Sequence, residues 1–348
     1  MENQGPTLRN FLPSIAFTVI CLLIAVWYCL DSGRPISTVM PLVIVLGLLE
    51  ISLSFDNAVV NASVLEGMEE KWRRYFLTWG ILIAVFGMRL VFPIAIVAVT
   101  AGLWPGEVVK MALARPDEYA RYISSSHVEV SAFGGMFLLL VFLTFLFDSD
   151  KKIHWLETIE KKLVEMGKLE SVEILIALIT LLFVQSFLPE SARVDTFIYG
   201  ISGIILYVAV DGLSTSISPS AASGLKRSGA MGFLYLEILD ASFSFDGVLG
   251  AFAITTDIVI IMLGLAIGAM FVRNLTVYLV DQGTLNEYAF LEHGAHYAIG
   301  ALAIIMLTTM IINVPELITG LIGILIISLA LISSIRYRKT QQAITNSQ

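Results

Sequence analysis

Long uninterrupted apolar segments constrain this chain more than any other feature. Several runs of about 20 residues carry few or no charges, and this is the length that a helix needs to cross a bilayer. The composition agrees, since 57% of the residues are hydrophobic and only 14% are charged, whereas a soluble domain carries roughly 25% charged residues. Because lipid cannot satisfy backbone polar groups, runs of this length predict membrane-spanning helices.

The predicted fold class is an all-α integral membrane protein of about ten transmembrane helices. The predicted spans are 11–30, 39–65, 76–101, 130–147, 172–188, 196–213, 231–254, 257–281, 296–313 and 315–335. Outside them, 14 Lys and Arg residues fall on the side of the N-terminus and 5 on the opposite side. Because cytoplasmic loops are enriched in Lys and Arg, this bias predicts that both termini are cytoplasmic.

Two halves joined by a charged segment make up the predicted domain organisation. Apolar residues recur every three or four positions in this segment, which predicts an amphipathic helix along the inner membrane surface. We expect a single long outer loop, at 102–129. The boundaries are 1–147 for the first half, 148–171 for the cytoplasmic linker, 172–335 for the remaining spans and 336–348 for a cytoplasmic tail.

An internal repeat is visible in the sequence. Residues 50–57 read E-I-S-L-S-F-D-N and residues 240–247 read D-A-S-F-S-F-D-G. Each copy therefore places a second acid six residues after the first. Ordered agreement at further polar landmarks indicates a duplication rather than a chance likeness between apolar segments. These landmarks are Gly80 with Arg89 and Gly264 with Arg273, nine residues apart, then His127 with Gly134 and His293 with Gly300, seven residues apart.

The repeat is predicted to be inverted. Its copies lie on the second and seventh spans, so the two motifs enter the membrane from opposite sides, as in many secondary transporters. On a straight helix Glu50 and Asp56 would project about 120° apart. Either the helix is broken near Ser54, or the two acids face different neighbours. We expect broken motif helices at the midplane, with Gly247 easing the break in the second copy.

Acids at membrane depth need a partner or a ligand, because a charge there costs roughly 2.5–3.5 kcal/mol on insertion scales. Carboxylate and amide oxygens suit a hard divalent cation, and the absence of thiolates argues against a copper or zinc pump. The alternative treats the acids as structural groups that hydrogen-bond between helices. The predicted metal ligands are Glu50, Asp56, Asn57, Asp240 and Asp246.

Other polar residues are assigned to the surroundings of this site. Arg89 and Arg273 fall inside spans, and structural ion pairing with the acids is the alternative for both. Three histidines near span ends, His127, His293 and His296, are predicted as a gate or proton relay, with interfacial anchoring as the alternative. The predicted supporting set is Ser54, Asn61, Ser244, Arg89, Arg273 and Glu237.

The motif residues resemble the TerC family of bacterial integral membrane proteins. The likeness rests on 50–57, 240–247 and L-E-H-G-A-H-Y-A-I-G at 291–300. It covers about residues 36–335 and is greatest for a branch long described as a domain of unknown function. TerC-like proteins are associated with tellurite resistance, some are implicated in manganese export, and the family is grouped with the LysE transporter superfamily. The resemblance implies a bacterial inner-membrane protein with its acidic site at the ligands named above, although Gly247 departs from the usual Asn- or Ser-like residue.

Three functional hypotheses follow. The leading one is a secondary transporter that exports a divalent cation, Mn²⁺ before Ca²⁺ or Mg²⁺, with protons as the expected counter-ion. A membrane scaffold in a metal or tellurite stress complex, with structural acids, is the alternative. An intramembrane aspartyl protease is disfavoured because the Gly-x-Gly-Asp context is absent. We expect no enzyme activity, no prosthetic group and no nucleic-acid partner. The expected partners are the bilayer and the metal ion, and homodimerisation is left open.

Overall fold

Helices account for all the regular structure in the described part of the chain. The computed structural model describes residues 8–148, 151, 153–166, 171–217, 229–283, 288–312 and 314–345. Each predicted span coincides with one helix or with consecutive helices, because an apolar segment in lipid must satisfy its backbone polar groups internally. The elements are α1 (Leu8–Ser32), α2 (Ile36–Leu53), α3 (Phe55–Glu66), α4 (Glu70–Leu82), the π-helix η1 (Ile83–Val91), α5 (Phe92–Thr100), α6 (Pro105–Ala114), α7 (Pro116–Ser125), α8 (His127–Phe147), α9 (Glu157–Met166), α10 (Val172–Ser186), α11 (Glu190–Ile217), α12 (Gly229–Ile254), α13 (Ile258–Asp281), α15 (Leu291–Thr309) and α16 (Glu316–Thr345).

Helices of membrane-spanning length and hydropathy are confirmed. Among the described residues six qualify, within α1, α2, α8, α11, α13 and α16. A seventh span results if Phe86–Thr100 and Pro105–Ala114, which meet at a bend of 112°, are counted as one. The expected total of ten crossings therefore stays a prediction.

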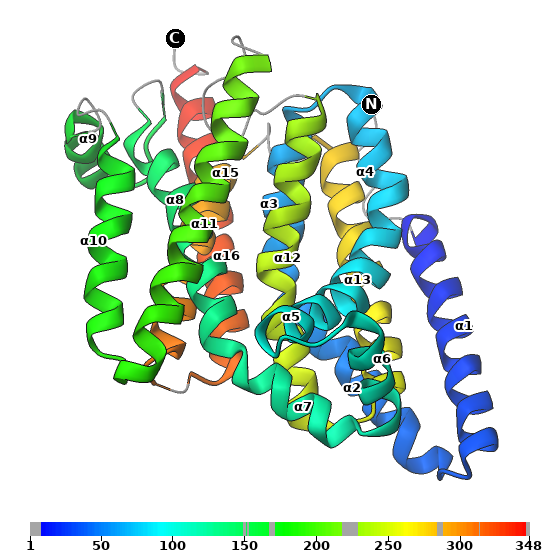
Figure 1. Cartoon of the computed structure of the whole chain (residues 1–348). Helices are drawn as coiled ribbons and strands as arrows, with labels where there is room; N and C mark the ends of the chain where they lie inside the picture. Colours follow the sequence, from blue (N-terminus) through cyan, green and yellow to red (C-terminus); the bar gives the residue numbers. More distant parts are fainter. Residues whose placement is uncertain are drawn as a thin grey trace.

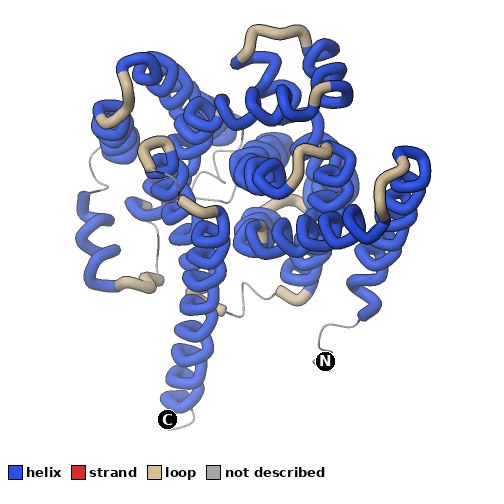
Figure 2. Tube along the Cα trace, turned by 90° about the horizontal axis from the view of Figure 1, so that it is seen from below, coloured by secondary structure: helices blue, strands red, loops and turns tan. Residues whose placement is uncertain are grey.

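The centre of the bundle is occupied by α12, which contacts α2, α3, α8, α13 and α16 among other helices (Figure 1). One apolar core joins α3, α8, α10, α11, α12 and α15, and a second joins α1, α2, α12 and α13. Figure 2 views the molecule from below, and several helices of the bundle are seen nearly end-on in it. The second acidic motif, at 240–247, therefore lies on a helix that contributes to both cores.

The first motif helix is interrupted, as predicted, whereas the second is not. Ser54 separates α2 from α3 with a non-helical backbone at φ −103° and ψ 14°. The interruption is one residue wide, since the Ser54 N–H donates to the Glu50 carbonyl at 2.9 Å and the Ala58 N–H to the Ser54 carbonyl at 3.4 Å. In the second copy α12 runs without a break from Gly229 to Ile254, so the predicted break there is wrong.

The space beside Gly247 explains why α12 is not broken at the second motif. A Cβ atom at Gly247 would lie 2.8 Å from Oε2 of Glu50. The glycine therefore makes room for the carboxylate of the other motif and leaves the helical backbone intact. The Ser242 hydroxyl donates to the Ile238 carbonyl one turn back at 2.9 Å, a contact that serine makes within a continuous helix.

Three segments outside the predicted spans contain helices. The predicted outer loop 102–129 folds into α6 and α7, whose residues Val108 and Tyr119 share a small apolar core with Val97 of α5. The linker contains α9, as its periodicity predicted. The tail continues α16 as far as Thr345.

Candidate functional site

Glu50 lies in the last turn of α2, within a close contact of three helices. Glu50 is only 1% exposed to solvent, and the Ser54 hydroxyl donates a hydrogen bond to its Oε1 at 2.8 Å. Glycines on α12 and α13 leave the space that it fills. A Cβ at Gly268 would lie 2.4 Å from the Cβ of Glu50, and the position of Gly247 is similarly close to the carboxylate. The position of this acid is thus determined by residues from both halves of the chain.

Arg89 reaches Glu50 from the π-helix η1. Its Nη2 atom forms an ion pair with Oε1 of Glu50, and the two side chains are 5% and 1% exposed. Because both side chains are buried, each charge is stabilised by the other. Removal of one partner would leave an uncompensated buried charge. The π-helical geometry is informative in itself, since it is rare and is frequent at functional sites.

A small cavity adjoins this pair. Its volume of about 20 Å³ exceeds the roughly 10–15 Å³ that one water requires, so it accommodates a single water-sized occupant. The side chain of Asn61 hydrogen-bonds to Asp240 within it. Carboxylate, amide and hydroxyl oxygens therefore meet here, which are the ligands that hard cations prefer. The lining residues are Ser54, Asn61, Phe76, Arg89, Asp240, Ala269, Val272, Arg273 and Thr276.

Arg273 enters the same cavity from α13. Its Nη2 donates to the backbone carbonyl of Phe76, and its guanidinium lies 5.0 Å from the centre of the Phe76 ring. Asp240 and Glu237 attract it electrostatically. Among the described residues, Oε1 of Glu237 is buried without a hydrogen-bond partner. A Cβ at Gly80 would lie 3.5 Å from that oxygen, so the absence of a side chain there leaves room for the carboxylate.

Asp56 faces a different helix from Glu50. It lies in the first turn of α3, where the helix dipole favours a carboxylate, and the Asn57 N–H donates to its Oδ1 at 3.1 Å. A Cβ at Gly323 of α16 would lie 2.6 Å from Oδ2 of Asp56. Both of the alternatives that the sequence left open therefore hold. The helix is interrupted at Ser54, and the two acids have different neighbours.

The structure brings together only part of the predicted metal set. Glu50 and Asp240 interact electrostatically within one polar centre, where Ser54, Asn61, Arg89 and Arg273 also lie. The side chain of Asp246 lies outside the described residues. Among the described side chains, no group of three His, Cys, Asp or Glu residues is arranged to hold a metal ion. The described side chains of the centre therefore do not form a preformed metal cage. Predicted residues that are buried but absent from the cavity lining are Glu50, Asp56, Asn57, Glu237 and Ser244.

The three predicted gate histidines are also absent from the cavity lining. His127 begins α8, and its Nε2 lies 3.3 Å from the Ser131 hydroxyl. His293 and His296 lie in the first two turns of α15. The His296 ring stacks on Phe145 of α8 with 3.7 Å between ring centres. This position associates the histidines of α15 with the end of the bundle rather than with the polar centre.

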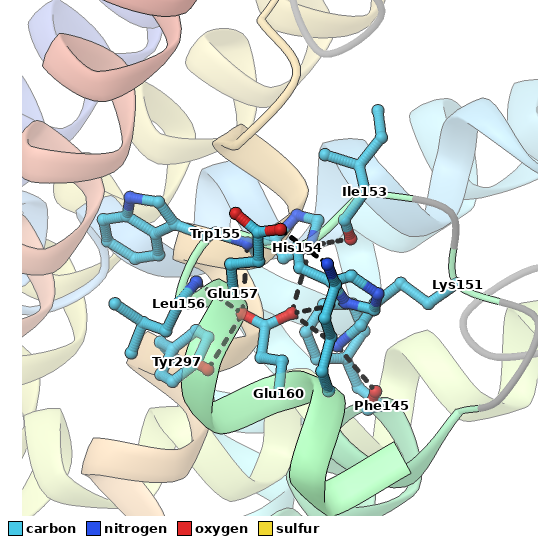
Figure 3. Close-up of polar contacts among 11 residues, drawn as sticks. Phe145, Lys151, Ile153, His154, Trp155, Leu156, Glu157, Glu160 and Tyr297 are labelled. Atoms are coloured by element: carbon cyan, nitrogen blue, oxygen red, sulfur yellow. Dashed lines mark hydrogen bonds and ion pairs between the residues drawn. The ribbon is translucent and has the colours of Figure 1, made fainter. Parts of the chain in front are cut away.

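Glu160 of α9 is the centre of a second buried polar cluster, shown in Figure 3. Its side chain is 0% exposed. Burial by itself would raise the pKa of Glu160, but hydrogen bonds from Leu156 and Lys151 and the nearby charges lower it to about 2. Oε1 accepts from the Trp155 N–H at 3.2 Å, the Leu156 N–H at 3.0 Å and the Tyr297 hydroxyl at 3.1 Å, while Oε2 lies 2.9 Å from Nζ of Lys151, 3.3 Å from Nδ1 of His154 and 3.7 Å from Nε2 of His293.

This cluster was missed by the sequence analysis. Glu160 is one of many charged residues in the linker, and no sequence pattern distinguishes it from the solvated ones. Only the fold shows that it anchors α9 to Tyr297 and His293 of α15.

A further ion pair, between the buried Asp257 and the half-exposed Arg34, lies at the opposite end of the bundle. Asp257 caps the N-terminus of α13 by accepting from the Val259 N–H at 3.0 Å. Its Oδ2 accepts a hydrogen bond from the Tyr28 hydroxyl at 2.8 Å and pairs with Arg34. These contacts join the connection between α1 and α2 to the start of α13, beside a cavity of about 150 Å³.

Comparison with known proteins gives one match. A family model described as "Protein of unknown function (DUF475)" matches residues 55–341. The matched range begins directly after the interruption at Ser54 and includes Arg89, the second acidic motif and Arg273. No curated protein and no solved structure matches the chain. The description agrees with the branch that the motif residues indicated, whereas the wider TerC relationship stays a prediction.

Proposed function

This chain belongs to the DUF475 family, and because the description of that family assigns no function, we propose one from the site. The protein is a secondary transporter that moves a hard divalent cation across a membrane, Mn²⁺ before Ca²⁺ or Mg²⁺. The proposed setting is the bacterial inner membrane, with ten crossings, both termini cytoplasmic and export as the direction.

The cavity beside Ser54 is the observation that carries this proposal. It combines the carboxylate of Asp240, the amide of Asn61 and the hydroxyl of Ser54 within the membrane bundle, at the scale of one small ion. Buried acids inside membrane helices are costly, and they commonly mark ion or proton pathways. A single ion bound there would be reached by ligands from both halves of the chain.

The opposite chain directions of the two motif segments support a site at a repeat interface. In Figure 1 the chain ascends through α2 and α3 and descends through α12, and these helices are in contact. Inverted repeats would place their motifs in this antiparallel relation. The choice of Mn²⁺ and of export comes from the resemblance to the TerC family, and the site itself favours only a hard cation.

One observation favours the alternative, a membrane scaffold with structural acids. Glu50 is already neutralised by Arg89 and hydrogen-bonded by Ser54, and no described group of three acidic, histidine or cysteine side chains is ready for a metal. In this interpretation the polar centre holds α2, η1 and α12 together, and the protein serves a metal or tellurite stress complex through its partners.

Metal flux into proteoliposomes distinguishes the two functions. We expect the wild-type protein to carry Mn²⁺ to an indicator trapped inside the vesicles, and Asp240→Asn to lower the rate by at least tenfold because it removes the cavity carboxylate. Glu70→Gln is the matched control, since Glu70 pairs with Arg74 on an exposed face of α4 and its flux should equal that of wild type.

Two results would contradict the transporter. Wild-type flux in a folded Asp240→Asn variant would show that the cavity is not on the ion path. The absence of Mn²⁺ and Ca²⁺ flux in every variant, with native partner complexes and stress tolerance intact in Asp240→Asn cells, would favour the scaffold. A pH gradient imposed in the same vesicles tests whether protons are the counter-ion.

A further inference from the structure

The carboxylate of Glu50 already has a cation, and the protein itself supplies it. Arg89 contributes a guanidinium to the same Oε1 atom that accepts the Ser54 hydroxyl. Arg89 also lines the small cavity in which Asp240 and Asn61 lie. The Arg89 side chain therefore pairs with Glu50, the acid of the first motif. It also lines the cavity beside Asp240, the acid of the second motif.

We propose that Arg89 is a tethered cation that fills the position of the transported ion at Glu50, and that the metal reaches Glu50 only by displacing it. This inference rests on the proposed transport function and adds the control of its site. It explains why no three-ligand metal group is found among the described side chains. With Arg89 in place, Glu50 is engaged, and Asp240, which Arg89 also attracts electrostatically, is the described carboxylate that lines the cavity.

Charge determines which ion can carry out the exchange. When Arg89 leaves, Glu50 becomes a buried carboxylate without a counter-charge, which is strongly unfavourable. A monovalent ion would only replace the charge that departs. A divalent cation brings one more positive charge and can be shared between Glu50 and Asp240, so the competition with Arg89 selects for divalent ions. The same competition limits leakage, because the site is never left empty of positive charge.

The segment that carries Arg89 is suited to movement. Nine residues of η1 adopt π-helical geometry between two α-helical segments. A π-helix is less favourable than the α-helix on either side of it, which is why it occurs mostly in single turns. Rewinding of this segment toward α-helical geometry changes the direction in which Arg89 projects, without breaking the span.

Arg273, the counterpart of Arg89 in the second half, shows a different arrangement. Its described hydrogen bond goes to the Phe76 carbonyl and its flat face lies on the Phe76 ring. No ion pair of Arg273 with a motif acid is found among the described residues. Of two arginines at matching repeat positions, one is thus ion-paired with a motif carboxylate, whereas the other hydrogen-bonds to a backbone carbonyl and lies over a ring while Asp240 and Glu237 attract it electrostatically. A backbone carbonyl and an aromatic ring face can therefore hold an arginine that is no longer paired with a carboxylate.

Equilibrium Mn²⁺ binding to the purified full-length protein tests this inference. Arg89→Gln removes the competitor, so we expect it to bind Mn²⁺ at least tenfold more tightly than wild type while its flux falls because release is slowed. Damage to a purely structural residue would instead weaken binding. Arg74→Gln is the matched control, since Arg74 lies in an exposed pair and its affinity should not change. Asp240→Asn should lose most Mn²⁺ binding.

The outcomes separate this inference from the proposed function. If wild type binds Mn²⁺ in a way that depends on Asp240, but Arg89→Gln binds equally or more weakly, transport stands and the role of Arg89 is refuted. If wild type binds Mn²⁺ no better than Asp240→Asn, both fall. Should Arg89→Gln fail to fold, Arg89→Lys takes its place. A compact ammonium lacks the fork geometry of a guanidinium, so it should compete less well and raise Mn²⁺ affinity several-fold, and unchanged or lower affinity would refute the inference.

Discussion

At the scale of single residues, glycines determine where the buried acids can lie. Gly247 and Gly268 leave the space that Glu50 fills, and Gly323 does the same for Asp56. Gly247 stands where the first copy has Asn57, and the sequence predicted that it would ease a break in the second motif helix. In the structure it is the contact surface for the acid of the other copy. A side chain at position 247 would therefore collide with Glu50.

Alanine at position 247 should destabilise the protein despite its higher helix propensity. In an open helical position, replacing Gly by Ala is favourable by up to about 1 kcal/mol. At Gly247 the new methyl group would lie 2.8 Å from the Glu50 carboxylate, and such overpacking costs about 1–3 kcal/mol. Thermal unfolding in detergent measures the difference.

Gly212→Ala on α11 provides the control for this prediction. A Cβ there would meet nothing within 4 Å, so its stability should be unchanged or higher. Equal stability of the two alanine variants would show that Glu50 is not held against α12.

At the scale of elements, three helices of similar composition behave differently for local reasons. The chain is interrupted at Ser54, passes through π-helical geometry in η1, and continues unbroken through α12. Glu50 is in contact with all three of these segments. Ser54 and Arg89 both interact with Glu50, and α12 remains helical while it receives that carboxylate at Gly247.

The linker helix α9 should stay docked at neutral pH and detach in strong acid. The pKa of Glu160 is about 2 in the folded protein, below the roughly 4.3 of an unperturbed glutamate. Folding therefore gains stability from this carboxylate above pH 4.3, and loses it as the pH falls through 2. Hydrogen exchange of α9 measured between pH 7 and pH 2 would follow this loss.

Glu160→Gln should release α9 even at pH 7. Neutralisation removes the ion pair with Lys151 and leaves buried donors unpaired, at a cost of about 1–3 kcal/mol. Glu157→Gln is the matched control, because Glu157 pairs with Lys161 on an exposed face and its loss should leave exchange unchanged. Full protection of α9 in Glu160→Gln would exclude the anchoring role.

At the scale of the whole molecule, the helices differ in how much of their apolar surface is buried inside the bundle. Apolar windows of α8 and α13 are 78% buried, whereas those of α1 and α16 are 17% and 28% buried. The first pair belongs to the interior, and the second pair presents large apolar side chains to the outside, as expected of a lipid-facing surface. In Figure 1 the start of α1 and the end of α16 point to the same end of the bundle.

Thiol labelling of intact cells tests the predicted orientation. A membrane-impermeant reagent should label Lys110→Cys on α6 from outside, and should reach Lys339→Cys at the end of α16 only after permeabilisation. The natural cysteines, Cys21 and Cys29, are buried and should give little background. Labelling of both positions from the same side would contradict both the orientation and the count of ten crossings.

Local properties of the sequence were sufficient for the class of fold and for several residues of the polar centre, but not for Glu160. Apolar length predicts membrane helices because lipid leaves the backbone no other partner, and the cost of buried charge singles out Glu50, Asp240, Arg89 and Arg273. The interruption near Ser54 was also anticipated, since one straight helix cannot aim both motif acids at the same point.

Only the tertiary structure decided how these residues are paired. Whether Asp56 joins Glu50 depends on which helices pack on each side of α3, and the packing of Gly323 directs Asp56 toward α16. The continuity of α12, the pairing of Arg89 with Glu50 and the burial of Glu160 depend likewise on contacts between distant segments. Hydropathy and motif spacing are properties of one continuous segment. The partner of a buried charge is determined by packing between segments that are distant in the sequence, so no single segment encodes it.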